Sequence, residues 1–371
     1  MAADRPLKVA FLYMKGRLRR LPEVEQGTAP TEFFYGAIEM GRQGYEIEHY
    51  EIDPKDTGSL PERLLETLWL RSARPVKLEA STLTQSFHLA KALNRADCLI
   101  ATGGNIAYAL AALASVGIIR KPIIGIQCGI LNFVHSPARR RMSRALLRRM
   151  HTMLFGLSEL APMRQFFDLS ADEISVNYFG VDTQFWQPGS AERDLVLAVG
   201  NDSRRDFATL VAAAERIDAP VHIVTQLPLP SPLPPNVTHH RGSWHGTEIS
   251  DVQIRELYQR SLAVAVPLIP TSQPSGQSVA LQAMACACPV VLTETEGLWS
   301  REHLQDGRNV LLVPTGDPAQ LAAKLNEAIA DTRAGGALGR RARESVERVG
   351  NVENFAGEMV RCVKEATSHQ A

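Results

Sequence analysis

The residues best suited to chemistry lie in one short segment. Ser275-Gly276-Gln277-Ser278 forms a small, flexible loop that leads into a helix-forming stretch, and that stretch runs into the apolar residues 289–292. Backbone amides at the start of a helix, together with the positive end of the helix dipole, favour a bound phosphate. Gln282 lies further along the same stretch, and its side-chain amide can hydrogen-bond the hydroxyls of a ribose. The segment predicts a phosphate site, with an ordinary serine helix cap as the alternative.

Two common nucleotide-binding fingerprints are missing from the sequence. Gly103-Gly104-Asn105 follows an expected strand, but its spacing differs from that of the dinucleotide motif GxGxxG. The phosphate-binding motif GxxxxGK[ST] does not occur. Cys286 and Cys288 have the spacing of neither a zinc site nor a redox motif, and the sequence contains no Asp-x-Asp. We therefore expect neither a dinucleotide oxidoreductase nor a P-loop NTPase.

The elements that must position these residues follow an alternating pattern. Strands that alternate with helices predict mostly parallel sheets covered on both faces. The first half is expected to hold strands at 8–13, 44–50, 97–101, 122–126 and 173–176, with helices at 33–42 and 106–116. The pattern then restarts, with strands at 194–200, 221–225, 237–240, 262–266, 289–292 and 310–314 and helices at 207–217, 249–260, 277–285 and 318–330.

This restart predicts two α/β domains, which also suits the length of 371 residues. We expect a first domain at residues 1–187 and a second at 188–350. A final helix within residues 351–371 is expected to pack back on the first domain.

Composition excludes several classes of protein. Lys plus Arg and Asp plus Glu both number 40, and the resulting zero net charge argues against a general nucleic-acid binder. No apolar run approaches the roughly 20 residues that a membrane span needs. We expect no signal peptide, because Lys15 and Arg17 soon follow the apolar stretch at the start of the sequence and leave no signal-peptide h-region. We therefore expect a cytoplasmic protein with reduced cysteines.

Positive charge is concentrated in residues 139–149, a stretch with arginines at positions 139, 140, 141, 144, 148 and 149. Arg141, Arg144 and Arg148 fall on one helical face. Such a face can meet anionic lipid headgroups at the inner side of a membrane, or a phosphorylated acceptor. An ordinary solvated helix face is the alternative interpretation.

Around the phosphate segment, the sequence resembles the retaining glycosyltransferases of family four, which have the GT-B fold. The run from Gln282 through Ala283-Met284-Ala285 to Pro289-Val290-Val291 is similar to the end of that family's Glu-x7-Glu motif and the strand after it. Flanking segments resemble the family's interdomain signature, its first donor-domain strand with a basic loop, and the segment after the donor site; they lie at 179–188, 198–206 and 307–321. The resemblance covers roughly residues 158–330 and implies two Rossmann-like, doubly wound domains that face a central cleft.

The resemblance also implies a set of site residues. Arg204 or Arg205 would be the catalytic cation that stabilises a leaving diphosphate. Trp244 would stack near the nucleobase, or alternatively pack in the core, and no metal or other cofactor is expected. The remaining donor-binding residues would be Gly16, Gly27, Gly200, Ser275, Gly276, Gln277, Ser278 and Gln282.

Two positions depart from the family's pattern. The first motif glutamate is replaced by Pro274 and the second by Gln282. The expected function is transfer of a sugar, of hexosyl type and with a UDP-sugar favoured, from a nucleoside-diphosphate sugar to an acceptor hydroxyl with retention. The acceptor would be a sugar, a lipid-linked glycan or a small molecule in polysaccharide or glycoconjugate biosynthesis. A catalytically silent scaffold or regulator, or a sugar-nucleotide epimerase, remains an alternative. The sequence leaves open the base, the oligomeric state and the stereochemistry.

Overall fold

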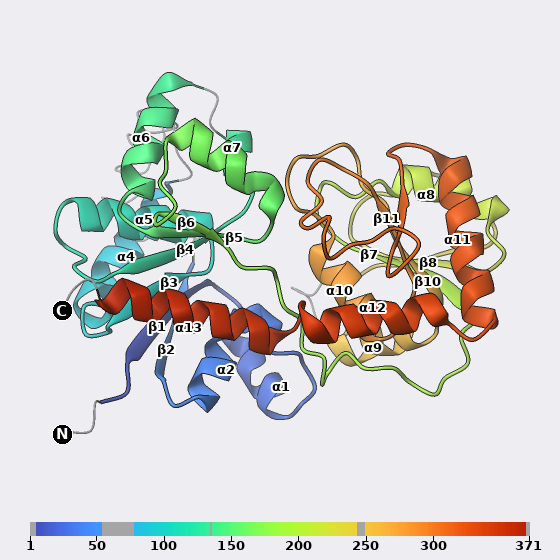
Figure 1. The fold of residues 1–371 in the computed structure, drawn as a ribbon, viewed down its shortest axis with the longest axis horizontal. Coiled ribbons are helices and arrows are strands. Elements are labelled where there is room, and N and C mark those ends of the chain that lie inside the picture. Colours follow the sequence, from blue (N-terminus) through green and yellow to red (C-terminus); the bar gives the residue numbers. More distant parts are fainter. Residues whose placement is uncertain (1–4, 54–77, 134–135, 243–248, 369–371) are drawn as a thin grey trace. The chain divides into compact units, whose positions relative to one another are not determined.

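The computed structural model describes residues 5–53, 78–133, 136–242 and 249–368 (Figure 1). Contacts divide the chain into two units. The first contains Met1–Leu21, Phe33–Asn177 and Phe355–Ala371, and the second contains Pro22–Glu32 and Tyr178–Asn354. The chain therefore passes into the second unit at residues 22–32 and returns to the first. The expected boundary after residue 187 lies inside the second unit.

A six-stranded parallel sheet in the order β2-β1-β3-β4-β5-β6 forms the centre of the first unit. All residues of β3 and β4 are buried, as continuous apolar runs covered on both faces require. The strands are β1 (Lys8–Met14), β2 (Glu46–Ile52), β3 (Cys98–Ala101), β4 (Ile123–Gln127), β5 (His151–Leu154) and β6 (Ile174–Val176). The helices are α2 (Ala37–Arg42), α4 (Ala80–Leu93), α5 (Gly104–Ser115), α6 (Pro137–Leu147), α7 (Leu157–Phe167) and α13 (Val352–Ser368), while α1 (Leu21–Glu25) spans the first crossing between units.

The second unit is built on another six-stranded parallel sheet, in the order β12-β11-β10-β7-β8-β9. Counted from β7, this is the Rossmann strand order, and the direction of winding changes between β7 and β10. The strands are β7 (Leu195–Val199), β8 (Val221–Val224), β9 (Val237–His240), β10 (Ser261–Val266), β11 (Val290–Thr293) and β12 (Leu311–Val313). The helices are α8 (Phe207–Ala213), α9 (Asp251–Gln259), α10 (Gln277–Ala285), α11 (Pro318–Arg333) and α12 (Ala337–Arg348).

The last helix, α13, returns to the first unit from Phe355 onward. The carbonyl of Phe355 accepts a hydrogen bond from Asn177 Nδ2 at 3.0 Å, and a Cβ on Gly36 would lie 3.2 Å from the Cα of Ala356. This close approach explains why a glycine stands at position 36. No helix in the described part of the chain is long and apolar enough to span a membrane.

The expected strands are confirmed, with ends shifted by a few residues, and the elements that were missed include α1, α4, α7, α12 and β5. Strand β5 consists of only four residues and begins with the polar pair His151-Thr152. Helix α12 is rich in charge and buries a narrow stripe that includes Leu338, Ala342 and Val346. Helix α4 is also absent from the sequence interpretation, since its buried face includes three hydroxyl residues, Ser81, Thr82 and Ser86.

Candidate functional site

The second unit has its topological switch point between β7 and β10. Leu197 of β7 lies opposite Val264 of β10 in the parallel ladder. Gly200 directly follows β7, and the loop after β10 leads to Gly276 and helix α10. Open α/β sheets bind ligands beyond the carboxyl ends of their strands at such a point. Gly200 and Gly276, two of the predicted donor residues, therefore lie where the fold favours a ligand.

The Arg205 side chain lies buried at this switch point. Only 4% of it is exposed, and its Nε lies 2.7 Å from Asp202 Oδ2. Its Nη1 is buried and has no hydrogen-bond partner among the described residues. Leaving a buried charged donor without a partner is costly, so native structures rarely do so without a reason. The position of this nitrogen fits an anion as the missing partner.

Two glycines make room for the Arg205 guanidinium. A Cβ on Gly200 would lie 2.2 Å from Arg205 Nε, and a Cβ on Gly276 would lie 3.1 Å from Nη1 and 2.5 Å from Val266 Cγ1. Gly276 also has a left-handed φ of +75° and is the N-cap of α10, with no side-chain cap. No side chain therefore caps the first amides of α10. We call Gly200, Arg205 and Gly276 with these amides the cradle.

Other predicted residues border the cradle. The Arg204 amide donates to Asp202 Oδ1 at 3.0 Å, and its carbonyl accepts from Ile269 at 3.0 Å, which fixes the loop beside β10. Ser275 and Gln277 are buried next to Gly276, and Ser278 is half-buried. Because Gly276 is the N-cap and no side chain caps it, the interpretation of this segment as an ordinary serine cap is wrong.

Gln282 is buried, and both ends of its side-chain amide are engaged. Its Nε2 donates to Glu32 Oε1 at 2.9 Å, and its Oε1 accepts from the Tyr258 hydroxyl at 3.2 Å. Glu32 belongs to the segment 22–32 that crosses into the second unit. Sequence reasoning missed Glu32, because no local pattern links it to a residue 250 positions away.

Glu32 is itself enclosed in a polar network. Its side chain is buried, Oε1 also accepts from Trp186 Nε1 at 2.7 Å, and Oε2 accepts from the Asp182 amide at 3.0 Å. Burial raises the pKa of Glu32 to about 8, although the hydrogen bonds from Gln282, Asp182 and Trp186 act in the opposite direction. A carboxyl group that can change its charge near neutral pH thus contacts helix α10.

The remaining predicted residues lie apart from this arrangement. Gly16 follows β1 in the first unit and has a φ of +99°. Gly27 lies on segment 22–32 with a φ of +69° and no atom within 4 Å of an added Cβ. Pro274 is buried, and Trp244 lies outside the described residues. Within the described ranges, no group of three or more His, Cys, Asp or Glu residues is arranged to hold a metal ion.

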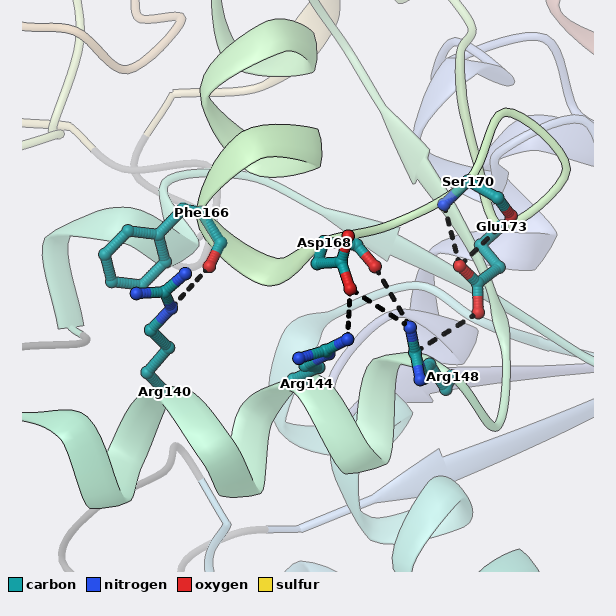
Figure 2. A network of polar contacts seen from close by, with 7 residues as sticks. All are labelled: Arg140, Arg144, Arg148, Phe166, Asp168, Ser170 and Glu173. Carbon is teal, nitrogen blue, oxygen red and sulfur yellow. Dashed lines mark hydrogen bonds and ion pairs between the residues drawn. The ribbon is translucent and has the colours of Figure 1, made fainter.

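The arginine-rich segment forms helix α6 in the first unit, and Figure 2 shows how its side chains are held. Arg140 Nε donates to the Phe166 carbonyl at 2.6 Å, and the guanidinium lies 4.9 Å from the centre of the Phe166 ring. Arg144 is ion-paired with Asp168. Much of the positive charge on this helix therefore already has a partner at the end of α7.

Arg148 completes this network at the C-terminal end of α6 (Figure 2). Its guanidinium reaches Asp168 Oδ2 at 3.5 Å and Glu173 Oε1 at 3.8 Å. Glu173 also accepts hydrogen bonds from the amide and hydroxyl of Ser170. Arg141 and Arg149 are exposed, and the described residues show no ion pair for either. Arg141, Arg144 and Arg148 were predicted to share one helical face. Arg144 and Arg148 are paired with Asp168, whereas Arg141 has no ion pair among the described residues.

Comparisons with known proteins support the fold and match the second unit to one family model. Residues 193–331 match the family model "Glycosyl transferases group 1". A search of curated proteins by sequence finds no match.

Solved structures similar to this chain cover nearly its whole length. A sucrose-phosphate synthase from Thermosynechococcus elongatus matches with a TM-score of 0.70 and 19% identity, over 98% of this chain and all of that one. A glycosyltransferase from Rickettsia africae matches with a TM-score of 0.69 and 12% identity, over 97% and 98% of the two chains. Anabaena HepE, solved with UDP and glucose, matches with a TM-score of 0.64 and 17% identity, over 97% of this chain and all of HepE. The chain therefore has the GT-B fold of two Rossmann-like domains, and its second unit carries the match to group 1 glycosyl transferases.

Proposed function

We propose that the protein is a glycosyltransferase that moves a sugar from a nucleoside-diphosphate sugar to an acceptor hydroxyl. The buried Arg205 carries this proposal, because its Nη1 has no partner in the described part of the chain and lies beside the N-terminus of α10, which no side chain caps. The arrangement joins a fixed cation to a set of amide donors, which is what a diphosphate needs. The match of residues 193–331 to group 1 glycosyl transferases supports the same reaction.

The chemistry of the cradle follows from the charge that develops during transfer. Breaking the bond between sugar and phosphate places negative charge on the leaving diphosphate. A cation and amides that are already oriented stabilise that charge without reorganisation. Arg205 is the proposed catalytic cation, and Arg204 stays a second candidate on the same loop. Because a guanidinium already serves the diphosphate, we propose that the reaction needs no metal.

The donor and the stereochemistry are finer parts of the proposal. A UDP-hexose is favoured, since the similar Anabaena protein was solved with UDP and glucose. Retention is proposed from the resemblance around Gln282, and the anomer of the product, observed by NMR spectroscopy, tests it. The acceptor is proposed to be a sugar, a lipid-linked glycan or a small molecule in polysaccharide or glycoconjugate biosynthesis.

A catalytically silent homologue is a second candidate, and one observation favours it. Both ends of the Gln282 amide are already engaged by Glu32 and Tyr258. The position of the first glutamate in the family's Glu-x7-Glu motif is occupied by the apolar Pro274. A scaffold would bind nucleotide without turnover. An epimerase would instead convert a donor when no acceptor is present, so analysis of the sugar product separates all three.

The experiment that tests the proposal starts with binding. Thermal unfolding is measured with UDP, GDP, ADP and TDP, and the ligand that binds should stabilise the protein by about 2.7 kcal/mol at 100 times its dissociation constant. The corresponding nucleotide sugars are then tested for release of the diphosphate. Absence of binding by all four diphosphates would overturn the proposal, while binding without turnover would favour the silent homologue.

Contact between helix α6 and an anionic membrane is a separate proposal. It is supported by the exposed guanidiniums of Arg141 and Arg149 and by the half-exposed Met142 beside them. Cosedimentation with vesicles that contain anionic lipid should fall in an Arg141→Ala/Arg149→Ala variant. Equal cosedimentation by both proteins, or none by the unchanged protein, would favour the solvated face instead.

A further inference from the structure

The segment 22–32 carries a carboxyl group into the second unit. The residues on either side of it, Leu21 and Phe33, belong to the first unit. Within the segment, the Thr28 amide returns to the Glu23 carbonyl at 2.8 Å, and the Thr31 amide donates to Asp182 Oδ2 at 3.2 Å. The segment ends on Glu32, which is 2% exposed. The chain therefore places one buried acid against helix α10 from a distant part of the sequence.

The contact of Glu32 with α10 is direct and lies close to the cradle. Gln282, which donates to Glu32 Oε1 at 2.9 Å, comes six positions after the N-cap Gly276. At about 1.5 Å of rise per residue, this separation is roughly 9 Å along the helix axis. The same helix thus contacts the buried acid at Gln282 and begins at the cradle.

We propose that Glu32 is a positioning residue for α10 and that binding of a nucleoside diphosphate at the cradle is coupled to uptake of a proton by Glu32. The inference rests on the function proposed above, because it needs a diphosphate at the cradle. Glu32 acts through Gln282 and touches no reacting atom. Its charge nevertheless shares the low-dielectric interior of the second unit with the charge of the ligand.

The direction of the coupling follows from Coulomb's law. An ionised Glu32 repels a diphosphate, and at roughly 10 Å with an effective dielectric constant of about 20 each pair of charges changes affinity by about tenfold. The ligand therefore favours the protonated carboxyl, and the protonated carboxyl favours the ligand. Burial already brings the pKa of Glu32 to about 8, so the group can take up a proton near neutral pH.

The groups around Glu32 leave it as the titrating member of its network. Asp182 is the acidic neighbour, and its side chain accepts hydrogen bonds from the amides of Thr31, Gln184 and Phe185. Tyr258 of α9 faces Gln282, and burial raises its pKa well above the usual value, so it stays neutral. The thiol of Cys286, which lies near Tyr258, also stays neutral because burial raises its pKa. Arg205 lies on the cradle side and is the cation that the ligand itself meets.

Calorimetry with UDP as the probe tests the proposal. Titrations at pH 8 in two buffers of different ionisation enthalpy give the number of protons taken up on binding. The unchanged protein should take up a fraction of one proton, and its affinity for UDP should fall about tenfold between pH 7 and pH 9. This range lies above the phosphate pKa of about 6, so the diphosphate of the ligand stays ionised.

Variants identify the group that takes up the proton. Glu32→Gln keeps an acceptor for Gln282 and Trp186 but cannot titrate, so proton uptake and the dependence of affinity on pH should both disappear. Glu159→Gln is the matched control, because Glu159 is a buried acid of the first unit whose pKa is raised to about 7. Its proton uptake should equal that of the unchanged protein.

A second variant covers the case in which Glu32→Gln does not fold. Trp186→Phe removes the donor 2.7 Å from Glu32 Oε1, so the pKa of Glu32 should rise further and the pH at which affinity falls should move upward. UDP binding without proton uptake, uptake that persists in Glu32→Gln, or an unmoved midpoint in Trp186→Phe would overturn this inference and leave the proposed function intact. Absence of binding by all four nucleoside diphosphates would overturn both.

Discussion

Two regions of the molecule use arginine in different ways. On α6 the side chains of Arg140, Arg144 and Arg148 lie at the surface and are held by Phe166, Asp168 and Glu173 (Figure 2). In the second unit a single arginine, Arg205, is buried between two glycines and keeps one nitrogen without a partner.

The difference between the paired arginines of α6 and the buried Arg205 indicates where a ligand is expected to bind. The number of cations is larger on α6, but paired surface charges contribute little and need no ligand. A buried nitrogen without a partner is costly and becomes favourable only when a ligand supplies an acceptor. A buried donor without a hydrogen-bond partner, rather than a high density of charge, therefore distinguishes the candidate site.

The largest effect is expected when Arg205 is removed. Arg205→Ala should weaken binding of the preferred nucleoside diphosphate roughly 100-fold, because loss of a buried charged partner costs about 2–5 kcal/mol. Isothermal titration calorimetry measures the affinity. Arg216→Ala is the matched control, since Arg216 is an exposed arginine beyond the other end of α8. Equal losses in the two variants would mean that the cradle is not the anion site.

The same criterion can be applied to Glu159, a buried acid in the first unit. Glu159 is 4% exposed, its Oε1 accepts from the Gly129 amide at 2.7 Å, and its Oε2 is buried with no hydrogen-bond partner within the described ranges. Burial raises the pKa of Glu159 from 4.5 to about 7, so the folded protein holds a proton there that the unfolded chain releases. Its stabilising contribution is complete below about pH 4.5 and is lost as the pH rises through 7.

The free energy of unfolding is therefore expected to fall as the pH rises. Between pH 5 and pH 7 the unchanged protein should lose about 2 kcal/mol more than Glu159→Gln, as the shift of the pKa requires. Urea denaturation at several pH values measures the difference between the two proteins. Parallel curves would show that Glu159 does not titrate in this range and that the criterion fails for acids in the first unit.

How much of this arrangement was predictable depends on whether the residues involved are close in sequence. Gly200, Gly276 and the start of α10 were found because a strand, a glycine and a helix follow one another locally. Glu32 and Asp168 were missed, since each reaches its partner through tertiary packing that leaves no periodic signal. The Gln282 amide is a middle case: the sequence marked it as a polar group on α10, but only the fold shows that Glu32 and Tyr258 engage it.

A smaller effect is expected from filling the space at Gly276. Gly276→Ala should reduce stability by about 1–2 kcal/mol and also weaken diphosphate binding, because its Cβ would lie 2.5 Å from Val266 and 3.1 Å from Arg205. Gly307→Ala is the control, since Gly307 has a similar φ of +70° and open space around an added Cβ. It should share the cost of the left-handed backbone and leave the affinity unchanged. A loss of affinity in both variants would trace the effect to global destabilisation.

The smallest effect is expected on α6. Asp168→Asn removes the charge that Arg144 and Arg148 share, while asparagine still tolerates the left-handed φ of 52° at this position. The loss of stability should be about 0.5 kcal/mol and should shrink as salt is added, because the side chains are 40–69% exposed. Thermal denaturation at low and high ionic strength measures it. A loss as large as that predicted for Glu159, unchanged by salt, would mean that the network is a structural core of the first unit, and the contrast with Arg205 would then rest on burial alone.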